Sequence, residues 1–219
     1  MLELGLPRSA PKKPLHILCL GAHCDDIELG CGGALLTLLA RYPRTRVTWV
    51  AFSGSAERVK ELKASSRRFL SRAGSSQVIT HEFRDGFFPG QFSAIKERFE
   101  GLKQLGSPDL VFKHQRDEHH QDHRVVAELT WNTFRDHLIL QYEIPKYEGG
   151  LTTPSAYIAF DKALAERKIR ILLDCYPTQR RKAWFTADTI RGLMRLRGTE
   201  SGSPTGWAEG FHAAKLLVG

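Results

Sequence analysis

The sequence lacks the features of a membrane or secreted protein. No apolar run approaches the ~20 residues that a helix needs to cross a bilayer. Residues 1–14 are polar, contain proline and lack the apolar core of a signal peptide. Only four cysteines are present and none forms a CxxC pair, so reduced thiols are the simple interpretation. We therefore expect a soluble, cytoplasmic protein without stable membrane insertion, in which residues 1–13 form a flexible segment.

Signals for nucleotide or nucleic-acid binding are also missing. No GxGxxG segment follows the first predicted strand, and aromatic residues do not alternate with basic ones. Gly30, Gly32 and Gly33 come too late and follow acidic residues that would repel phosphates. The net charge of +8 favours acidic partners, but the lysines and arginines are spread along the chain, as on a solvated surface. A non-enzymatic binding module is thus a weak hypothesis, and we expect no nucleic-acid partner.

The remaining composition is that of a globular domain. Hydrophobic residues make up 42% of the sequence and charged residues 26%. A chain of 219 residues is most simply one domain, over residues 1–219. Apolar runs predict strands at 15–20, 47–52, 78–83, 110–113, 137–142 and 156–160. Helical spacing predicts helices at 32–41, 56–73, 92–105, 125–134, 161–175 and 186–197, followed by a weakly amphipathic stretch at 207–217. This alternation predicts an α/β fold, a three-layer α/β/α Rossmann-like sandwich with a mostly parallel central sheet.

An unusual cluster follows the first predicted strand. Residues 21–33 read GAHCDDIELGCGG and place His23, Asp25 and Asp26 where a strand ends and a helix begins. In open α/β sheets, ligands gather outside the carboxyl ends of the strands. Carboxylates buried there are costly unless they are paired or bound to a metal. The cluster therefore indicates a binding or catalytic site rather than packing.

A second cluster, residues 114–124, follows the strand predicted at 110–113. It holds four histidines and two aspartates in eleven residues. His120 and His123 lie on one side of a helix if that helix begins near Gln121. The two clusters converge if their strands are neighbours. Histidine and carboxylate ligands suit a catalytic zinc ion, which activates water, while a further carboxylate and a hydrogen-bond donor complete the chemistry of hydrolysis.

Both clusters resemble the LmbE/PIG-L family of zinc-dependent N-acetylglucosaminyl deacetylases. The family motif Ala-His-Pro-Asp-Asp-x-Glu-x-Gly-x-Gly-Gly reads here Ala-His-Cys-Asp-Asp-Ile-Glu-Leu-Gly-Cys-Gly-Gly from Ala22, and His-x-Asp-His reads His-Gln-Asp-His from His120. The resemblance implies one Zn²⁺ per chain with three protein ligands, which are His23, Asp26 and His123. It also implies that Asp25 is the general base for a metal-activated water. His120 would donate to the oxyanion, and Asp122 would orient His120.

Several positions keep more than one interpretation. Arg58, in a segment that also resembles the family, either reaches toward the substrate or forms a surface ion pair with Glu61. Cys24 replaces the family proline, so it either loosens the turn, offers a thiolate to the metal or is a bystander thiol. His114, Asp117 and His119 either line the mouth of the site or have another role. In that case Asp117 caps the loop, and His114 and His119 belong to a surface loop.

The resemblance implies a hydrolase that removes the N-acetyl group from an N-acetylglucosamine-type amino sugar or glycoconjugate. The alternative is a zinc amidase that acts on a non-sugar amide, because the metal motifs do not distinguish these substrates. Sites built from histidine and aspartate also accept other divalent metals such as iron or cobalt. Homo-oligomers are common in the family, but no number of subunits follows from the sequence.

Overall fold

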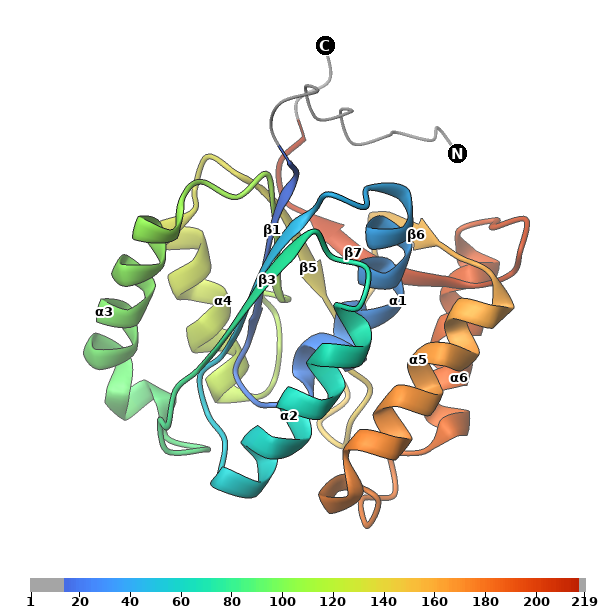
Figure 1. Cartoon of the computed structure of the whole chain (residues 1–219). Coiled ribbons are helices and arrows are strands. Elements are labelled where there is room, and N and C mark those ends of the chain that lie inside the picture. The colour runs from blue at the N-terminus through green and yellow to red at the C-terminus, as the bar shows by residue number, and fades with distance from the viewer. Residues whose placement is uncertain (1–13, 217–219) are drawn as a thin grey trace.

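A computed structural model describes residues 14–216. Residues 1–13, predicted above as a flexible segment, lie outside the described part together with 217–219. Within it, seven strands form one sheet in the order β3-β2-β1-β4-β5-β7-β6 (Figure 1). The strands are β1 (His16–Gly21), β2 (Arg46–Ala51), β3 (Ser75–Thr80), β4 (Leu110–His114), β5 (Leu138–Tyr142), β6 (Ala156–Ala159) and β7 (Ala208–Ala213). The first five are parallel to one another, and β7 is antiparallel to both β5 and β6.

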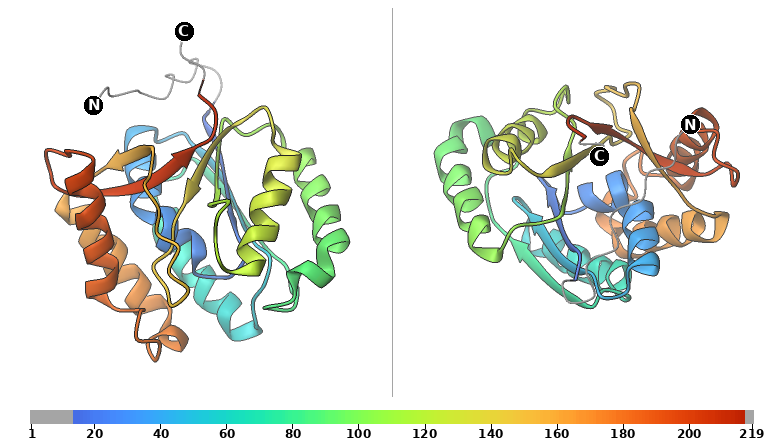
Figure 2. Two further views of the ribbon diagram at one scale, coloured as in Figure 1. Left: turned by 180° about the vertical axis from the view of Figure 1, so that it is seen from behind. Right: turned by 90° about the horizontal axis from the view of Figure 1, so that it is seen from above.

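Helices cover both faces of this sheet (Figure 2). One layer contains α1 (Asp26–Arg41), α2 (Ala56–Phe69), α5 (Lys162–Cys175) and α6 (Ala187–Glu200), and the other contains α3 (Phe92–Leu102) and α4 (Gln121–Thr133). Each layer packs on its own hydrophobic core. The predicted three-layer sandwich with a mostly parallel sheet is thereby confirmed. Within residues 14–216, no helix has the length and apolar character that a membrane span requires.

The central strands are buried on both sides, which explains their continuous apolar character. In β1, Ile17 packs into the core under α1 and Leu18 into the core under α3 and α4. In β2, Trp49 and Val50 alternate in the same way. Such strands are typical of parallel sheets between two helical layers.

The stretch predicted as weakly amphipathic at 207–217 contains strand β7 instead. It pairs with β5 on one side and with β6 on the other. Glu209 and Phe211 are two residues apart and lie on the same face of β7. Phe211 enters the core under α1, and Glu209 contacts that helix. Pairing on both edges decides this structure, because strand formation depends more on neighbouring strands than on local sequence.

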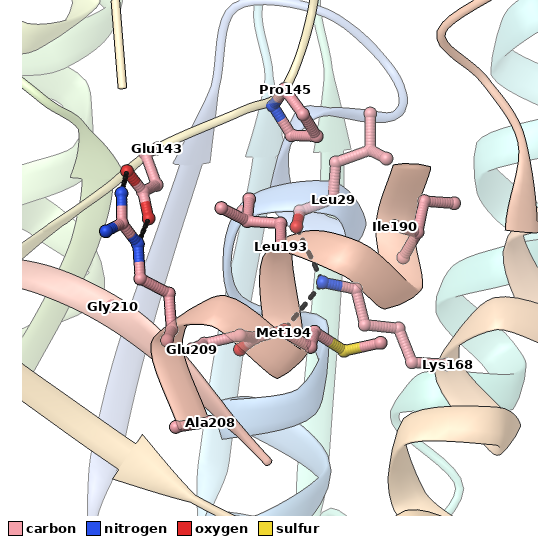
Figure 3. Close-up of a pocket in the computed structure, with 12 residues that line it drawn as sticks. Leu29, Glu143, Pro145, Lys168, Ile190, Leu193, Met194, Ala208, Glu209 and Gly210 are labelled. Atoms are coloured by element: carbon pink, nitrogen blue, oxygen red, sulfur yellow. Dashed lines mark hydrogen bonds and ion pairs between the residues drawn. The ribbon is translucent and has the colours of Figure 1, made fainter. Parts of the chain in front are cut away.

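Helix α1 begins at Asp26, six residues before the predicted start, and is interrupted at Cys31, whose φ of −141° is not helical. The break frees the amides of Gly33 and Ala34, which donate to the Glu209 carboxylate at 2.8 and 2.7 Å. The ammonium group of Lys168 donates to the carbonyl of Leu29 and to Glu209, each at 2.6 Å (Figure 3). A buried ion pair from α5 and β7 therefore holds the glycine-rich end of the first motif.

Candidate active site

The site lies at the carboxyl edge of the sheet, which is the lower edge in Figure 1. Strands β1 and β4 are parallel neighbours, with Ile17 opposite Leu110. The chain that leaves β1 starts α1 at Asp26, and the chain that leaves β4 starts α4 at Gln121. The two sequence clusters therefore meet at one place between the helical layers.

Three side chains of these clusters bring their donor atoms together. Nδ1 of His23 lies 3.1 Å from Nε2 of His123 and 3.4 Å from Oδ2 of Asp26. Nε2 of His123 lies 3.5 Å from Oδ1 of Asp26. Ligands at 2.0–2.1 Å from a tetrahedral zinc ion are about 3.3 Å from one another. Since Asp26 and His123 are buried and the His23 side chain is 17% exposed, the group fits a zinc ion that is open to solvent on one side.

The charges of Asp26 and His123 suit a metal. Burial alone would raise the pKa of Asp26, but His123, His114 and His23 around it lower that pKa well below its usual value. Burial lowers the pKa of His123 well below its ordinary range. Burial opposes the charged form of His23 as well, yet its contacts with Asp26 and Asp122 raise its pKa. An ionised Asp26 and a neutral His123 are the forms that bind metal ions.

His120 is the N-cap residue of α4. Its Nδ1 accepts a hydrogen bond from the amide of Asp122 at 3.3 Å, so the proton of the neutral ring is assigned to Nε2. Burial, together with His23 and Lys146, lowers the pKa of His120 and favours the neutral ring. One nitrogen of His120 lies within 4.8 Å of donor atoms of His23 and His123. His120 is therefore a neutral N–H donor beside His23 and His123.

The Asp122 carboxylate contacts His23 and a neighbouring loop. It accepts hydrogen bonds from the amides of Gly86 at 2.6 Å and Phe88 at 3.1 Å, and its Oδ2 lies 3.3 Å from Nε2 of His23. Asp85, 73% exposed, places Oδ1 3.0 Å from the same Nε2. The resemblance implied that Asp122 orients His120. In the structure the Asp122 carboxylate contacts His23, its backbone amide donates to Nδ1 of His120, and one carboxylate oxygen lies within 4.8 Å of a His120 ring nitrogen.

Asp25, the residue before Asp26, forms an ion pair with Arg58 of α2. Nη2 of Arg58 lies 2.8 Å from Oδ1 of Asp25, and Nη1 lies 2.9 Å from Oε2 of Glu61. The Arg58 side chain is only 16% exposed, and Nη1 also donates to the hydroxyl of Thr178 at 3.1 Å. The ion pair with Glu61 considered above thus exists, but it lies largely inside the protein and reaches Asp25.

Cys24 does not take part in the candidate metal clusters found within residues 14–216. Its Sγ donates to the carbonyl of Ser53 at 3.5 Å. Burial raises the pKa of this thiol to about 12, so the thiolate form is disfavoured. These observations favour the bystander interpretation of Cys24.

The structure places residues that the sequence left open and adds two, Lys146 and Glu118, that it did not single out. His114, one of the residues left open above, is fully buried at the end of β4, with Nε2 3.1 Å from Oδ2 of Asp26. Lys146 lies after β5 in a loop without a recognisable motif, and its Nζ is 2.8 Å from Nδ1 of His123. Glu118 is buried in the second cluster, whereas Asp117 and His119 are exposed.

Comparison with known proteins agrees with this geometry. The profile of the PIG-L family, described as GlcNAc-PI de-N-acetylase, matches residues 18–134, which is more than half of the chain and includes both clusters. The chain belongs to the PIG-L family. Its members are deacetylases, so the family places this protein among the hydrolases that act on amides.

The chain is also similar to individual proteins and solved structures. The uncharacterised deacetylase YaiS of Escherichia coli K12 is 29% identical over 167 residues, which cover 73% of this chain and 85% of YaiS. The N,N'-diacetylchitobiose deacetylase of Pyrococcus horikoshii superposes with a TM-score of 0.65 at 19% identity, over 92% of this chain and 84% of that one. The 4-carboxy-2-hydroxymuconate hydratase GalB of Pseudomonas putida KT2440 superposes with a TM-score of 0.72 at 15% identity, over 94% of this chain and 98% of GalB. Likenesses this distant show the fold alone, so the reaction has to be argued from the site.

Proposed function

We propose that this PIG-L family protein is a zinc-dependent hydrolase that removes the N-acetyl group from an N-acetylglucosamine-type amino sugar or glycoconjugate. The supporting observation is the cluster of His23, Asp26 and His123, in which Nδ1 of His23 lies 3.1 Å from Nε2 of His123 and each ring nitrogen lies within 3.5 Å of one oxygen of Asp26. The family description and the fold shared with a diacetylchitobiose deacetylase support the choice of an amino sugar.

In this proposal His23, Asp26 and His123 hold the ion. When bound, zinc supplies a Lewis acid that polarises the amide carbonyl and lowers the pKa of a water molecule to about 7. The ionised Asp26 compensates half of the charge of the ion. Asp122 and Asp85 accept a hydrogen bond from Nε2–H of His23 and so keep Nδ1 of this ring directed at Asp26 and His123.

Asp25 is the proposed general base. Arg58 binds its Oδ1, and we assign Oδ2 to the attacking water. As the water oxygen attacks the amide carbon, the proton moves to Asp25. The Nε2–H of His120 donates to the carbonyl oxygen, which becomes negative in the tetrahedral intermediate. The C–N bond then breaks as the proton held by Asp25 moves to the leaving nitrogen, and the products are the free amine and acetic acid, which ionises to acetate.

The substrate assignment is tested by measuring acetate release from N-acetylglucosamine, N,N'-diacetylchitobiose and a series of non-sugar N-acetyl amides of matched size. We expect turnover of the sugars that is abolished by a chelator and restored by zinc. Activity confined to the non-sugar amides would instead identify an amidase with the same chemistry. A chelator-resistant activity would contradict the proposed metal.

We also propose a cytoplasmic location, which the free thiols of all four cysteines support.

A further inference from the structure

The buried carboxylate of Glu118 contacts the backbone of His120 and the ring of His123. Its side chain is 2% exposed. Oε1 accepts from the amides of His119 at 2.8 Å and His120 at 3.4 Å. Oε2 lies 3.2 Å from Nδ1 of His123 and 3.3 Å from Nζ of Lys146. Glu118 therefore contacts the backbone at the N-cap of α4 and the ring of His123 one turn later.

Lys146 approaches the same ring nitrogen from the loop after β5. Its Nζ lies 2.8 Å from Nδ1 of His123, and its side chain is 7% exposed. An ammonium group can only donate, so its hydrogen bond needs the lone pair of Nδ1 and leaves the ring proton on Nε2. A carboxylate can only accept, so the contact with Glu118 needs a proton on Nδ1 and leaves the lone pair on Nε2.

The contacts with Lys146 and Glu118 require different tautomers of the His123 ring, and only one of these tautomers can bind a metal ion through Nε2. Nε2 of His123 is the atom that faces Nδ1 of His23 and Oδ1 of Asp26. A metal ion bound there needs the Nε2 lone pair, and hence the tautomer that Glu118 selects. Carboxylates that accept from the outer nitrogen of a metal-binding histidine hold the ring in place and increase its basicity.

We propose that Glu118 is a positioning residue that selects the metal-binding tautomer of His123, and that Lys146 opposes this selection while it neutralises the Glu118 carboxylate. This inference rests on the proposed function, because it assumes that His123 holds the ion. A merely structural ion pair predicts that removal of either partner weakens the site in the same way. The proposed competition predicts opposite effects on metal affinity.

The test compares the wild-type chain with Glu118→Gln, Lys146→Met and the control Glu128→Gln, which changes an exposed glutamate on α4. Zinc affinity is measured by competition with a chromophoric chelator. We expect Glu118→Gln to bind zinc about 10- to 100-fold more weakly, Lys146→Met to bind at least as tightly as wild type, and the control to be unchanged. In thermal denaturation without metal, both Glu118→Gln and Lys146→Met should melt below wild type, because each breaks a buried pair.

A second readout does not need zinc. Long-range ¹H–¹⁵N spectra of the histidine rings report which nitrogen carries the proton. Without metal, we expect Glu118→Gln to shift His123 toward the Nε2–H form and Lys146→Met to shift it toward the Nδ1–H form. Should Glu118→Gln fail to fold, Lys146→Met and Glu118→Asp carry the same comparison.

The inference is overturned if Glu118→Gln binds zinc as wild type does, if Lys146→Met loses as much affinity as Glu118→Gln, or if neither substitution changes the tautomer. These results are distinguishable from a failure of the proposed function. If wild type binds no zinc, the proposed function is wrong, and the spectra still decide whether Glu118 selects the tautomer.

Discussion

The guanidinium group of Arg58 lies between two carboxylates, with Nη2 2.8 Å from Asp25 and Nη1 2.9 Å from Glu61. Thr178, which follows α5, donates its amide and hydroxyl to Glu61, and the Tyr176 ring lies 5.0 Å from Arg58. The orientation of Asp25 therefore depends on α2 and on the segment after α5, although Asp25 itself belongs to the first motif.

If Asp25 is the general base, Asp25→Asn removes the proton acceptor and preserves the shape of the side chain. We expect turnover to fall by about 10²- to 10⁴-fold, the usual contribution of a general base. Because Asp25 is not a proposed ligand, zinc content by elemental analysis should stay at one ion per chain. A zinc-loaded Asp25→Asn variant with wild-type turnover would remove Asp25 from the mechanism.

Arg58→Lys tests whether Arg58 acts through Asp25 or on the substrate. Lysine presents a single ammonium group and cannot reproduce the fork that reaches both Asp25 and Glu61. We expect kcat to fall by about 10-fold or more with little change in KM, since a misplaced base affects the chemical step. Arg68→Lys is the matched control, because Arg68 lies on the same helix and pairs with Asp174 at the surface. A large rise in KM at constant kcat would show instead that Arg58 binds the substrate.

The frame of the site could be predicted from the sequence because its signals are local. Apolar runs identify the central strands, and the two histidine and aspartate clusters follow β1 and β4 directly. What brings the clusters together is the adjacency of β1 and β4, although β2 and β3 lie between them in the chain. The sequence shows that the clusters can converge if these strands are neighbours, but it does not predict that they are neighbours.

The outer part of the site could not be predicted, because it depends on contacts between loops and distant elements. Lys146 lies in a loop without periodicity, yet it reaches His123. Asp85 lies in a turn that is held by hydrogen bonds from its amides to Asp122. Glu209, near the end of the chain, binds the amides at the break in α1. Hydrophobic patterning does not record such polar contacts, which become visible only when the elements are packed.

The ion pair of Lys168 and Glu209 should contribute strongly to stability. Lys168→Met keeps most of the apolar volume but leaves Glu209 without its partner, and removal of one partner of a buried pair costs about 3–5 kcal/mol. We expect the free energy of unfolding, measured with urea, to fall by about that amount. The control Lys162→Met changes an exposed lysine of the same helix and should have little effect. An equally stable Lys168→Met variant would show that the break in α1 does not need the ion pair.

Lys113 should make stability depend on pH in the alkaline range. It is buried in β4, and Nζ donates to the side-chain oxygen of Gln141 at 2.9 Å. Burial, together with the nearby Arg116, lowers its pKa to about 7 in the folded protein, whereas an unfolded lysine titrates near 10.4. Between these values the unfolded chain holds a proton that the folded chain has released. The contribution of Lys113 to the free energy of unfolding therefore rises with pH from about 7 to about 10, by at most ~1.4 kcal/mol per pH unit.

Lys113→Met removes this titration, so it should be more stable than wild type at pH 6, where wild type buries a charged ammonium group. The advantage should shrink steadily as the pH rises from 7 to 9. Urea unfolding of both proteins at several pH values gives the difference directly and cancels the titration of all other groups that the substitution leaves unchanged. Lys63→Met, at an exposed position of α2, should show no such trend. A difference between wild type and Lys113→Met that stays constant with pH would mean that Lys113 remains protonated in the folded protein across this range.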